Sequence, residues 1–338
     1  LIGRAATIAD SSPILPTAAR DQVPLSFAQE RLWFIDRLMV GAAYNIPVAV
    51  RLKGPLDIAI LEGALNKIVA RHEALRTSFA EIDGRPVQVI HEARPIAVQS
   101  VSPDGASADE RLGDARARLS GLAALPFDLE RGPLLRLTVF DLDPDDHLAL
   151  LVIHHIAADA WSFGLLLREL AAFYGALALG GEPAVPELAV QYADFSAWQR
   201  RQVADRGGEQ LRFWRQALAG APGAEFPADR PRPAVQTYRG GASRLELEGG
   251  LVDKLKAFSA REGATPFIVA LAAFFVLFHR WSGADDLVVG APVAGRARPE
   301  TQNLIGCFIN PLPLRADLSG NPTFCELLAR VKQGVLAA

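Results

Sequence analysis

The sequence VIHHIAADAWS, residues 152–162, joins a hydrophobic run to a polar turn and then to an amphipathic segment. The run from Leu148 to Ile153 is continuously apolar, which is typical of a β-strand buried on both faces. It ends at the only two adjacent histidines of the chain, His154 and His155. A helix capped by Ser162 is predicted to follow. The paired histidines are therefore expected at the end of a buried strand, where a turn leads into a helix.

Helical and strand-like periods alternate on both sides of this stretch, which predicts an α/β fold with layers of helix and sheet. Ser26 and Gln29 form a capping box at the start of the first predicted helix. Further helices are predicted over 56–69, 107–122, 162–179, 191–218 with an interruption near 206–208, 251–259 and 265–280 and from 321, and strands over 44–52, 85–90, 134–140, 148–153, 242–247, 286–290 and 304–314.

Changes in composition and clusters of Gly and Pro predict that the chain has three parts. Residues 1–22 are rich in Ala, Ser, Thr and Pro and are interpreted as a linker or the tail of a preceding module. Gly180, Gly181, Pro183 and Pro186 break the helical pattern and mark a boundary between two lobes. The lobes are expected over 23–185 and 186–338.

Composition narrows the class of protein. The chain has 338 residues, 50% of them hydrophobic, and a net charge of −3, with no block of like charge. That pattern does not favour binding to nucleic acid or to a membrane surface. Cys307 and Cys325 provide neither a disulfide framework nor a metal-binding cluster, so a reducing, cytoplasmic setting is expected. The first residues have no signal-peptide pattern, and the apolar run from Pro266 to Phe278 is too short to span a bilayer.

The paired histidines are the best candidates for chemistry. Successive side chains of a strand point to opposite faces, so His154 and His155 cannot both face one cavity. A histidine has an ordinary pKa of about 6.5 and can exchange a proton or donate hydrogen bonds to an oxyanion near neutral pH. One of the two is therefore expected to serve a reaction and the other to serve the core.

Asp159, four residues after His155, has two possible roles. It can orient His155 as in a catalytic triad, or it can turn away and pair with an arginine that fixes the turn. The second role is favoured because no serine in a GxSxG-type elbow completes a hydrolase site. No cysteine is close to the histidines in sequence, although Cys307 can approach them in space. The lack of a covalent nucleophile favours direct transfer of an activated acyl group between two bound substrates.

Five segments in order resemble the motifs of condensation domains of nonribosomal peptide synthetases, within the chloramphenicol acetyltransferase-like acyltransferases. HHxxxD alone is moderately specific, whereas the ordered set is highly specific and covers nearly all of the chain after residue 23. The segments are Ser26–Leu38, Arg71–Phe79, His154–Ser162, Tyr192–Gln199 and Ile305–Arg315.

The resemblance implies two acyltransferase-like lobes arranged in a V, with the active site in a tunnel between them. It also implies that two peptidyl carrier domains, upstream and downstream, deliver the substrates as thioesters on phosphopantetheine arms, with no tightly bound cofactor. An amine on one arm attacks the acyl or peptidyl thioester on the other. An adenylation domain is the expected neighbour.

The resemblance also implies roles for single residues. His155 is the residue nearest the reaction, and Asp159 is structural and pairs with Arg71, with Arg296 and Arg315 as further candidates. The other residues expected to support the site are His154, Ala160 and Trp161, and the residues expected to line the tunnel are Asn310, Arg296 and Ser162.

Two departures from the family pattern keep alternatives open. Ala160 replaces the glycine of HHxxxDG, which costs energy if that position needs a positive φ or close approach. The chain stops at Ala338, before further family motifs, so the second lobe is expected to be incomplete. The alternatives are an epimerisation domain, a stand-alone acyltransferase, and a docking module without turnover.

Overall fold

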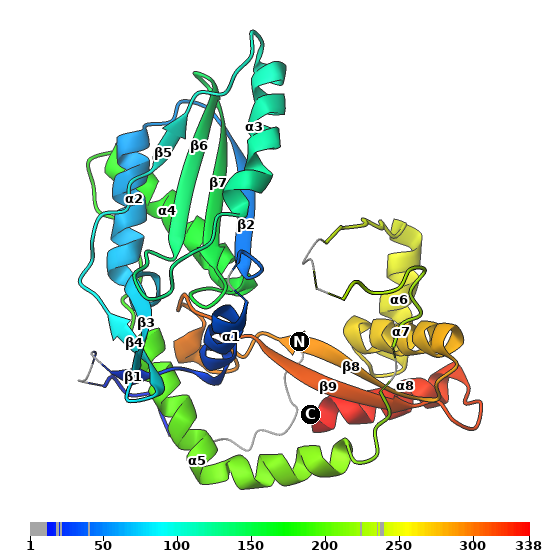
Figure 1. Ribbon diagram of the computed structural model, residues 1–338. Coiled ribbons are helices and arrows are strands. Elements are labelled where there is room, and N and C mark those ends of the chain that lie inside the picture. The colour runs from blue at the N-terminus through cyan, green and yellow to red at the C-terminus, as the bar shows by residue number, and fades with distance from the viewer. Residues whose placement is uncertain are drawn as a thin grey trace. The chain divides into compact units, whose positions relative to one another are not determined.

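The computed structural model describes residues 12–17, 20, 22–39, 41–223, 225–234, 236 and 240–338 (Figure 1). The helices are α1 (Phe27–Leu38), α2 (Ile58–Arg71), α3 (Ala108–Ala123), α4 (Ala160–Ala178), α5 (Tyr192–Ala217), α6 (Gly249–Arg261), α7 (Pro266–Ser282) and α8 (Phe324–Ala337). The strands are β1 (Val23–Pro24), β2 (Asn45–Lys53), β3 (Thr77–Ile82), β4 (Arg85–Ile90), β5 (Gln99–Val101), β6 (Leu135–Asp143), β7 (Asp146–His154), β8 (Asp286–Val293) and β9 (Asn310–Asp317). Short 3₁₀ turns cover Glu73–Arg76 and Pro299–Thr301.

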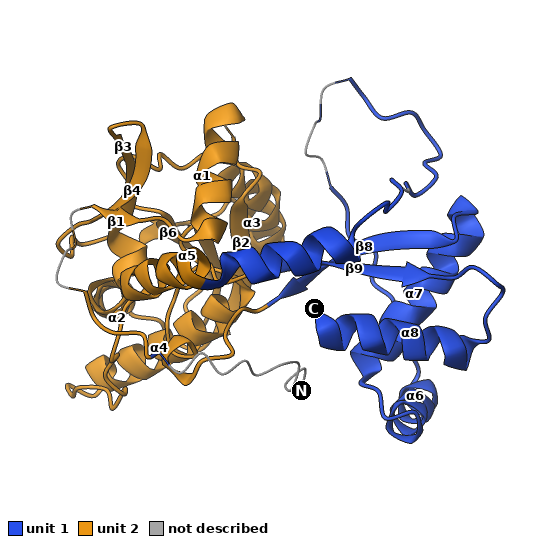
Figure 2. Ribbon diagram, turned by 90° about the horizontal axis from the view of Figure 1, so that it is seen from below, with its two compact units in different colours: residues 1–12, 206–293, 310–338 blue, residues 13–205, 294–309 orange. Residues whose placement is uncertain are grey.

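The chain divides into two compact units, coloured separately in Figure 2. Unit 1 contains residues 1–12, 206–293 and 310–338, and unit 2 contains residues 13–205 and 294–309. Residues 294–309, here called the return segment, thus belong to unit 2 although the strands on both sides of them belong to unit 1.

This division differs from the predicted boundary near Gly180. The helical pattern does break there, because α4 ends at Ala178, but the division falls within α5, between Asp205 and Arg206. The first part of α5 stays with unit 2 because its apolar residues join a buried cluster of that unit. The cluster contains Ile14, Ala74, Val190, Tyr192, Phe195, Leu304 and Phe308.

From Pro13 on, the described part of the predicted linker belongs to unit 2. Ile14 is buried, the Thr17 backbone N–H donates to Asp194 at 2.8 Å, and Arg20 pairs with the same carboxylate at 2.7 Å. Residues 1–11, 18, 19 and 21 of that prediction lie outside the described residues.

Unit 2 is built around a four-stranded sheet with the order β2-β7-β6-β5. Strand β7 is central and buried along its whole length, as its continuous hydrophobic run predicts. Its odd-numbered residues, such as Leu151 and Ile153, pack with α2 and α4, whereas its even-numbered residues, such as Leu150 and Val152, pack with α3. Figure 1 shows these helices on the two faces of the sheet. Both layers of helix therefore hold the strand that ends at the histidines.

A second sheet, with the order β1-β4-β3, lies in the same unit. The predicted capping box is confirmed: the Gln29 N–H donates to Ser26 Oγ, and the Ser26 N–H donates to the Gln29 side chain. The element α1 therefore begins where the sequence predicts.

Unit 1 is smaller in its described part and contains the antiparallel pair β8-β9 with α7 and α8. A buried cluster that includes Ala272, Phe275, Leu287, Leu314 and Leu328 holds these elements together. Most predicted elements are confirmed, but residues 242–247 form neither helix nor strand and are exposed. The predicted strand over 304–314 begins at Asn310, and α5 runs without the predicted interruption.

Candidate active site

The end of β7 is fixed from both sides before the chain turns. The His154 N–H donates to the Leu134 carbonyl at 3.0 Å, and the His155 N–H donates to the Tyr44 carbonyl at 2.8 Å. These two bonds hold the backbone of both histidines, so their side chains have defined and separate surroundings.

The side chain of His154 belongs to the core. It is 1% exposed, its Nδ1 accepts a hydrogen bond from the Ile156 N–H at 3.2 Å, and its ring meets the Phe127 ring edge-on. Burial lowers its pKa to about 4, with the charge of the adjacent His155 acting in the same direction. His154 is therefore neutral at pH 7, with its proton on Nε2.

The side chain of His155 is partly exposed, in contrast to that of His154. Its Nδ1 lies 3.7 Å from the Sγ of Cys307, in the return segment. Cys307 is fully buried, and this burial raises the pKa of its thiol to about 12, with the charge of Asp159 acting in the same direction. The two histidines therefore separate into a core residue and a residue available for chemistry, as the strand alternation predicts.

Asp159 is the N-cap of α4. Its Oδ1 accepts hydrogen bonds from the Ser162 N–H at 2.9 Å and from the Arg296 guanidinium at 3.0 Å, and its Oδ2 accepts from the Phe308 N–H at 3.0 Å. The prediction of Ser162 as the cap is wrong, because α4 begins earlier and Ser162 lies within its first turn. The carboxylate thus holds a helix start and the return segment together.

Arg296 is the partner of Asp159. Its side chain is buried against the Phe308 ring, 4.0 Å from the ring centre, and it also donates to the carbonyls of Thr301 and Leu304. Burial lowers the pKa of the guanidinium, and the Asp159 carboxylate opposes that shift. A buried arginine that is paired and hydrogen-bonded on several sides is a structural group.

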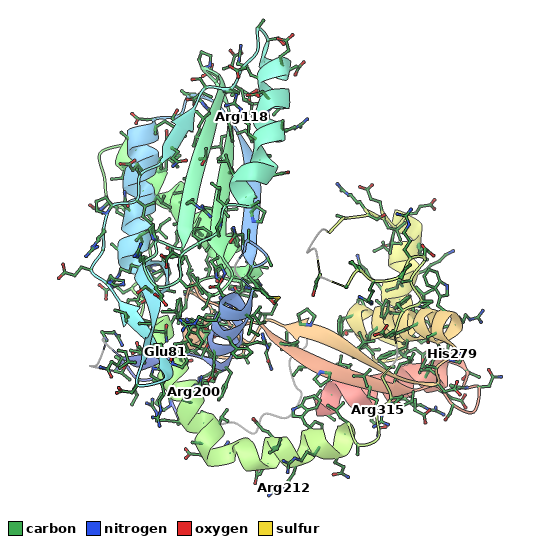
Figure 3. The ribbon with its side chains drawn as sticks, in the orientation of Figure 1. Glu81, Arg118, Arg200, Arg212, His279 and Arg315 are labelled. Atoms are coloured by element: carbon green, nitrogen blue, oxygen red, sulfur yellow. The ribbon has the colours of Figure 1, made fainter. Side chains whose placement is uncertain are left out.

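The predicted pairing of Asp159 with Arg71 is therefore wrong. Arg71 instead pairs with Glu169 at 3.2 Å, because it ends α2 beside α4. Arg315, on β9 in Figure 3, pairs with Asp286 at 2.6 Å. Arg296, the second candidate of the sequence analysis, takes the place beside Asp159.

The residues expected to line a tunnel have different surroundings. Ser162 is 0% exposed and Arg296 is 6% exposed. Both residues are therefore buried inside unit 2 and do not line an open tunnel. Ser162 Oγ accepts from the Gly306 N–H at 3.1 Å. Asn310 is exposed and opens β9 in unit 1.

Trp161 and Ala160 occupy the first turn of α4. The Trp161 indole N–H donates to the Gln302 carbonyl at 3.0 Å, which ties this turn to the return segment. Ala160 is the first residue of the helix and is exposed, and it is not among the described residues with positive φ. Alanine therefore fits this position without backbone strain, and as a helix former it suits it better than glycine.

Several residues that hold the site were missed by the sequence analysis. Tyr192 is buried and its hydroxyl donates to the Cys307 carbonyl at 2.5 Å. A Cβ added to Gly306 would lie 1.9 Å from the Tyr192 ring, so only glycine fits there. His72 bonds Glu169 at 2.8 Å through Nε2 and accepts from the Ile305 N–H through Nδ1. The sequence feature that could have identified Tyr192, Gly306 and His72 is their position inside three of the five family motifs.

Among the described residues, no three His, Cys, Asp or Glu side chains are arranged to hold a metal ion. Within the same residues, no single helix has the length and apolar composition needed to span a membrane. The elements α6 and α7 meet that test only as a pair, with a bend of 102° between them.

Comparisons with known proteins place these features in a family. The family model described as "Condensation domain" matches residues 19–338, so the chain belongs to the condensation domain family. The chain is 50% identical over 329 residues to a linear gramicidin synthase of Brevibacillus parabrevis, covering 96% of this chain and 6% of that relative. The chain thus spans a small fraction of the length of such a relative.

Solved structures agree with the fold. The crystal structure of the X-domain from teicoplanin biosynthesis is similar, with a TM-score of 0.86, 34% identity and coverage of 96% of this chain and 72% of that chain. The first condensation domain of the CDA synthetase gives a TM-score of 0.75 at 26% identity, covering 95% of this chain and 76% of that chain. The mixed α/β fold predicted from the sequence is therefore confirmed.

Proposed function

We propose that the chain is a condensation domain that forms an amide bond between two carrier-bound substrates. The amine of an aminoacyl group attacks the thioester carbon of an acyl or peptidyl group. A C–N bond forms, the C–S bond breaks, and the proton lost by the amine ends on the departing thiol. The observation that carries the proposal is a partly exposed histidine, His155, at the end of a fully buried strand in a chain of this family.

The proposed reaction does not require a strong base to deprotonate the amine. An α-amino group has a pKa of about 7.7–8.0, so roughly a tenth of it is already uncharged at pH 7. His155 therefore serves best by positioning the amine and stabilising the charges of the tetrahedral intermediate. Asp159 and Arg296 form a buried ion pair with each other. We therefore assign the stabilisation of charge to His155.

The substrates are proposed to arrive on phosphopantetheine arms of an upstream and a downstream carrier domain, with an adenylation domain as a neighbour. The family and the much longer synthetase relative support this setting. Asn310, exposed at the start of β9, is proposed to face the substrate tunnel. The proposed location is the cytoplasm, which suits the free thiols of Cys307 and Cys325.

The test replaces His155 by alanine. Turnover is expected to fall by about 10²–10⁴-fold, the usual contribution of a histidine at a reacting centre. The measurement offers acyl-loaded and aminoacyl-loaded carrier proteins and quantifies the amide by mass spectrometry. The matched control is His279→Ala, which removes a histidine of unit 1, labelled in Figure 3, that pairs with Asp285.

The same assay separates the alternatives. Near-normal amide formation by His155→Ala would contradict the assigned role. Loss of deuterium from the α-carbon of the carrier-bound substrate without amide formation would instead identify an epimerisation domain. Absence of both products with the unaltered chain and correctly loaded carriers would identify a docking module.

A further inference from the structure

The thiol of Cys307 contacts His155 but has no role in the proposed reaction. The Cys307 Sγ lies 3.7 Å from the Nδ1 of His155, and the cysteine side chain is fully buried. Its backbone carbonyl is already the acceptor for the Tyr192 hydroxyl. The return segment therefore places the thiol of Cys307 against Nδ1 of the histidine ring.

The contact has a preferred direction. Burial keeps the thiol protonated, since its pKa is raised to about 12, with the charge of Asp159 raising it and that of Arg31 lowering it. A thiol is a weak acceptor and an imidazole nitrogen is a good one. The thiol hydrogen is therefore best placed on the line from Sγ to Nδ1.

We propose that Cys307 is a positioning residue whose S–H donates to Nδ1 of neutral His155 and so keeps the ring proton on Nε2. The inference rests on the proposed function for its consequence, although the tautomer itself does not depend on it. In a neutral histidine, the hydrogen bond made by one nitrogen decides whether the other carries the proton.

This tautomer determines whether His155 donates or accepts in its hydrogen bond with the substrate. With Nδ1 occupied by the thiol, the other nitrogen, Nε2, is a donor in the neutral ring. A donor can stabilise negative charge on the carbonyl oxygen as the tetrahedral intermediate forms, but it cannot accept a hydrogen bond or a proton from the amine. Of the two contributions proposed for His155, this tautomer therefore selects charge stabilisation over positioning of the amine. The proton leaves the amine for the departing thiolate, so the histidine ends the step in the form in which it began.

The first experiment determines the tautomer directly. The chain is labelled with ¹⁵N-histidine, and the two-bond correlation spectrum is recorded at pH 8, with His155→Ala used to assign the resonances of His155. A protonated Nε2 and an unprotonated Nδ1 are expected. A protonated Nδ1 would overturn the proposal, whatever the behaviour of any variant.

The second experiment removes the thiol. Cys307→Val keeps the volume similar but has no donor, so the His155 resonances are expected to shift toward a mixture of tautomers. Turnover is expected to fall by about two- to tenfold, the value of one ordinary hydrogen bond. The matched control is Cys325→Val, which replaces an exposed thiol and is expected to change neither quantity.

The outcomes are distinguishable. An unchanged tautomer in a Cys307→Val chain with an intact fold would overturn the positioning role of the thiol. If Cys307→Val also lowered turnover by the same factor in the His155→Ala background, the effect would not pass through the histidine, which would overturn the proposal as well. Failure of the proposed function appears separately, as unchanged amide formation by His155→Ala.

Discussion

The side chains of two adjacent histidines differ in their exposure in this chain. His154 is enclosed by the core and kept neutral, with a pKa of about 4, whereas His155 is partly exposed. A buried histidine with a lowered pKa makes the stability of the fold depend on pH. Between the two pKa values, the histidine binds a proton in the unfolded chain but not in the folded chain.

The stability of the chain is therefore expected to fall as the pH is lowered through the window from about 6.5 to about 4. Below the ordinary pKa of about 6.5 the unfolded state gains a proton at His154, and the loss is complete near the folded pKa of about 4. The difference amounts to about 3 kcal/mol of unfolding free energy. Urea titrations at a series of pH values measure it.

The matched variant for this prediction is His154→Asn, whose side-chain oxygen can accept the Ile156 N–H in place of Nδ1. The variant is expected to show a flatter profile across that window. Carboxylates such as Glu169 and Asp194 also have lowered pKa values, but their contribution is lost at a lower pH and is common to both proteins. Identical profiles for the two proteins would contradict the role assigned to burial.

At the residue scale, the sequence predicted that the two histidines have different surroundings, because alternation along a strand is a local rule. The choice of His155 as the reactive one came from the family resemblance and stays a prediction. The sequence also predicted that Asp159 pairs with an arginine. It did not predict Arg296 as that arginine, since the partner lies 137 positions away in the chain and the pairing depends on the path of the return segment.

The return segment is the element on which the site depends most. It contains neither α-helix nor strand, apart from one 3₁₀ turn, and it is held instead by bonds to the ends of other elements. Asp159 holds Phe308, Ser162 holds Gly306, and Trp161 bonds Gln302. Because all three partners belong to the first turn of α4 or its cap, this turn determines where Cys307 lies.

Breaking the ion pair between Asp159 and Arg296 is expected to destabilise the chain strongly. Arg296→Met keeps the aliphatic contact with Phe308 but leaves the carboxylate buried without its cation, at a cost of about 3–5 kcal/mol. Asp159→Asn is expected to cost a similar amount. The double variant should cost less than the sum of the two, as measured by a double-mutant cycle in urea.

The control for this cycle is Arg315→Met, which removes a less buried pair with Asp286 in unit 1. A much smaller cost than that of Arg296→Met is expected there, because water screens an exposed ion pair. Additive costs for Asp159→Asn and Arg296→Met would show that the two side chains are not coupled.

Most elements followed from hydrophobic periodicity and caps, as the capping box of α1 and the buried run of β7 illustrate. The failures have physical causes. Residues 242–247 alternate like a strand, but none of the described strands pairs with them. Asp159 and Ser162 both suit an N-cap, and only the structure shows which one precedes the helix.

At the scale of the whole molecule, the described residues from 240 to 248 are an exposed stretch without helix or strand. Trypsin is expected to cleave first after Arg244, whose side chain is 87% exposed. Exposed irregular segments are the usual sites of proteolytic nicking. Limited digestion followed by mass spectrometry measures the site.

Arg244→Gln is expected to delay the first cut by removing the site. A first cut inside residues 41–205 would instead show that unit 2 opens more readily than this stretch, contrary to its larger buried core. The sequence predicted the family from five ordered motifs, yet it did not predict this division into units, because contacts between distant segments define it.

The path of the return segment constrains how such domains can be recombined. The chain enters unit 2 twice, through residues 13–205 and again through 294–309. A splice that exchanges residues 13–205 alone between two synthetases would pair the Asp159 and Ser162 of one parent with the Arg296 and Gly306 positions of the other. Chimaeras are therefore expected to fold only when residues 13–205 and 294–309 are transferred together. The shorter segment is required although it has only 16 residues.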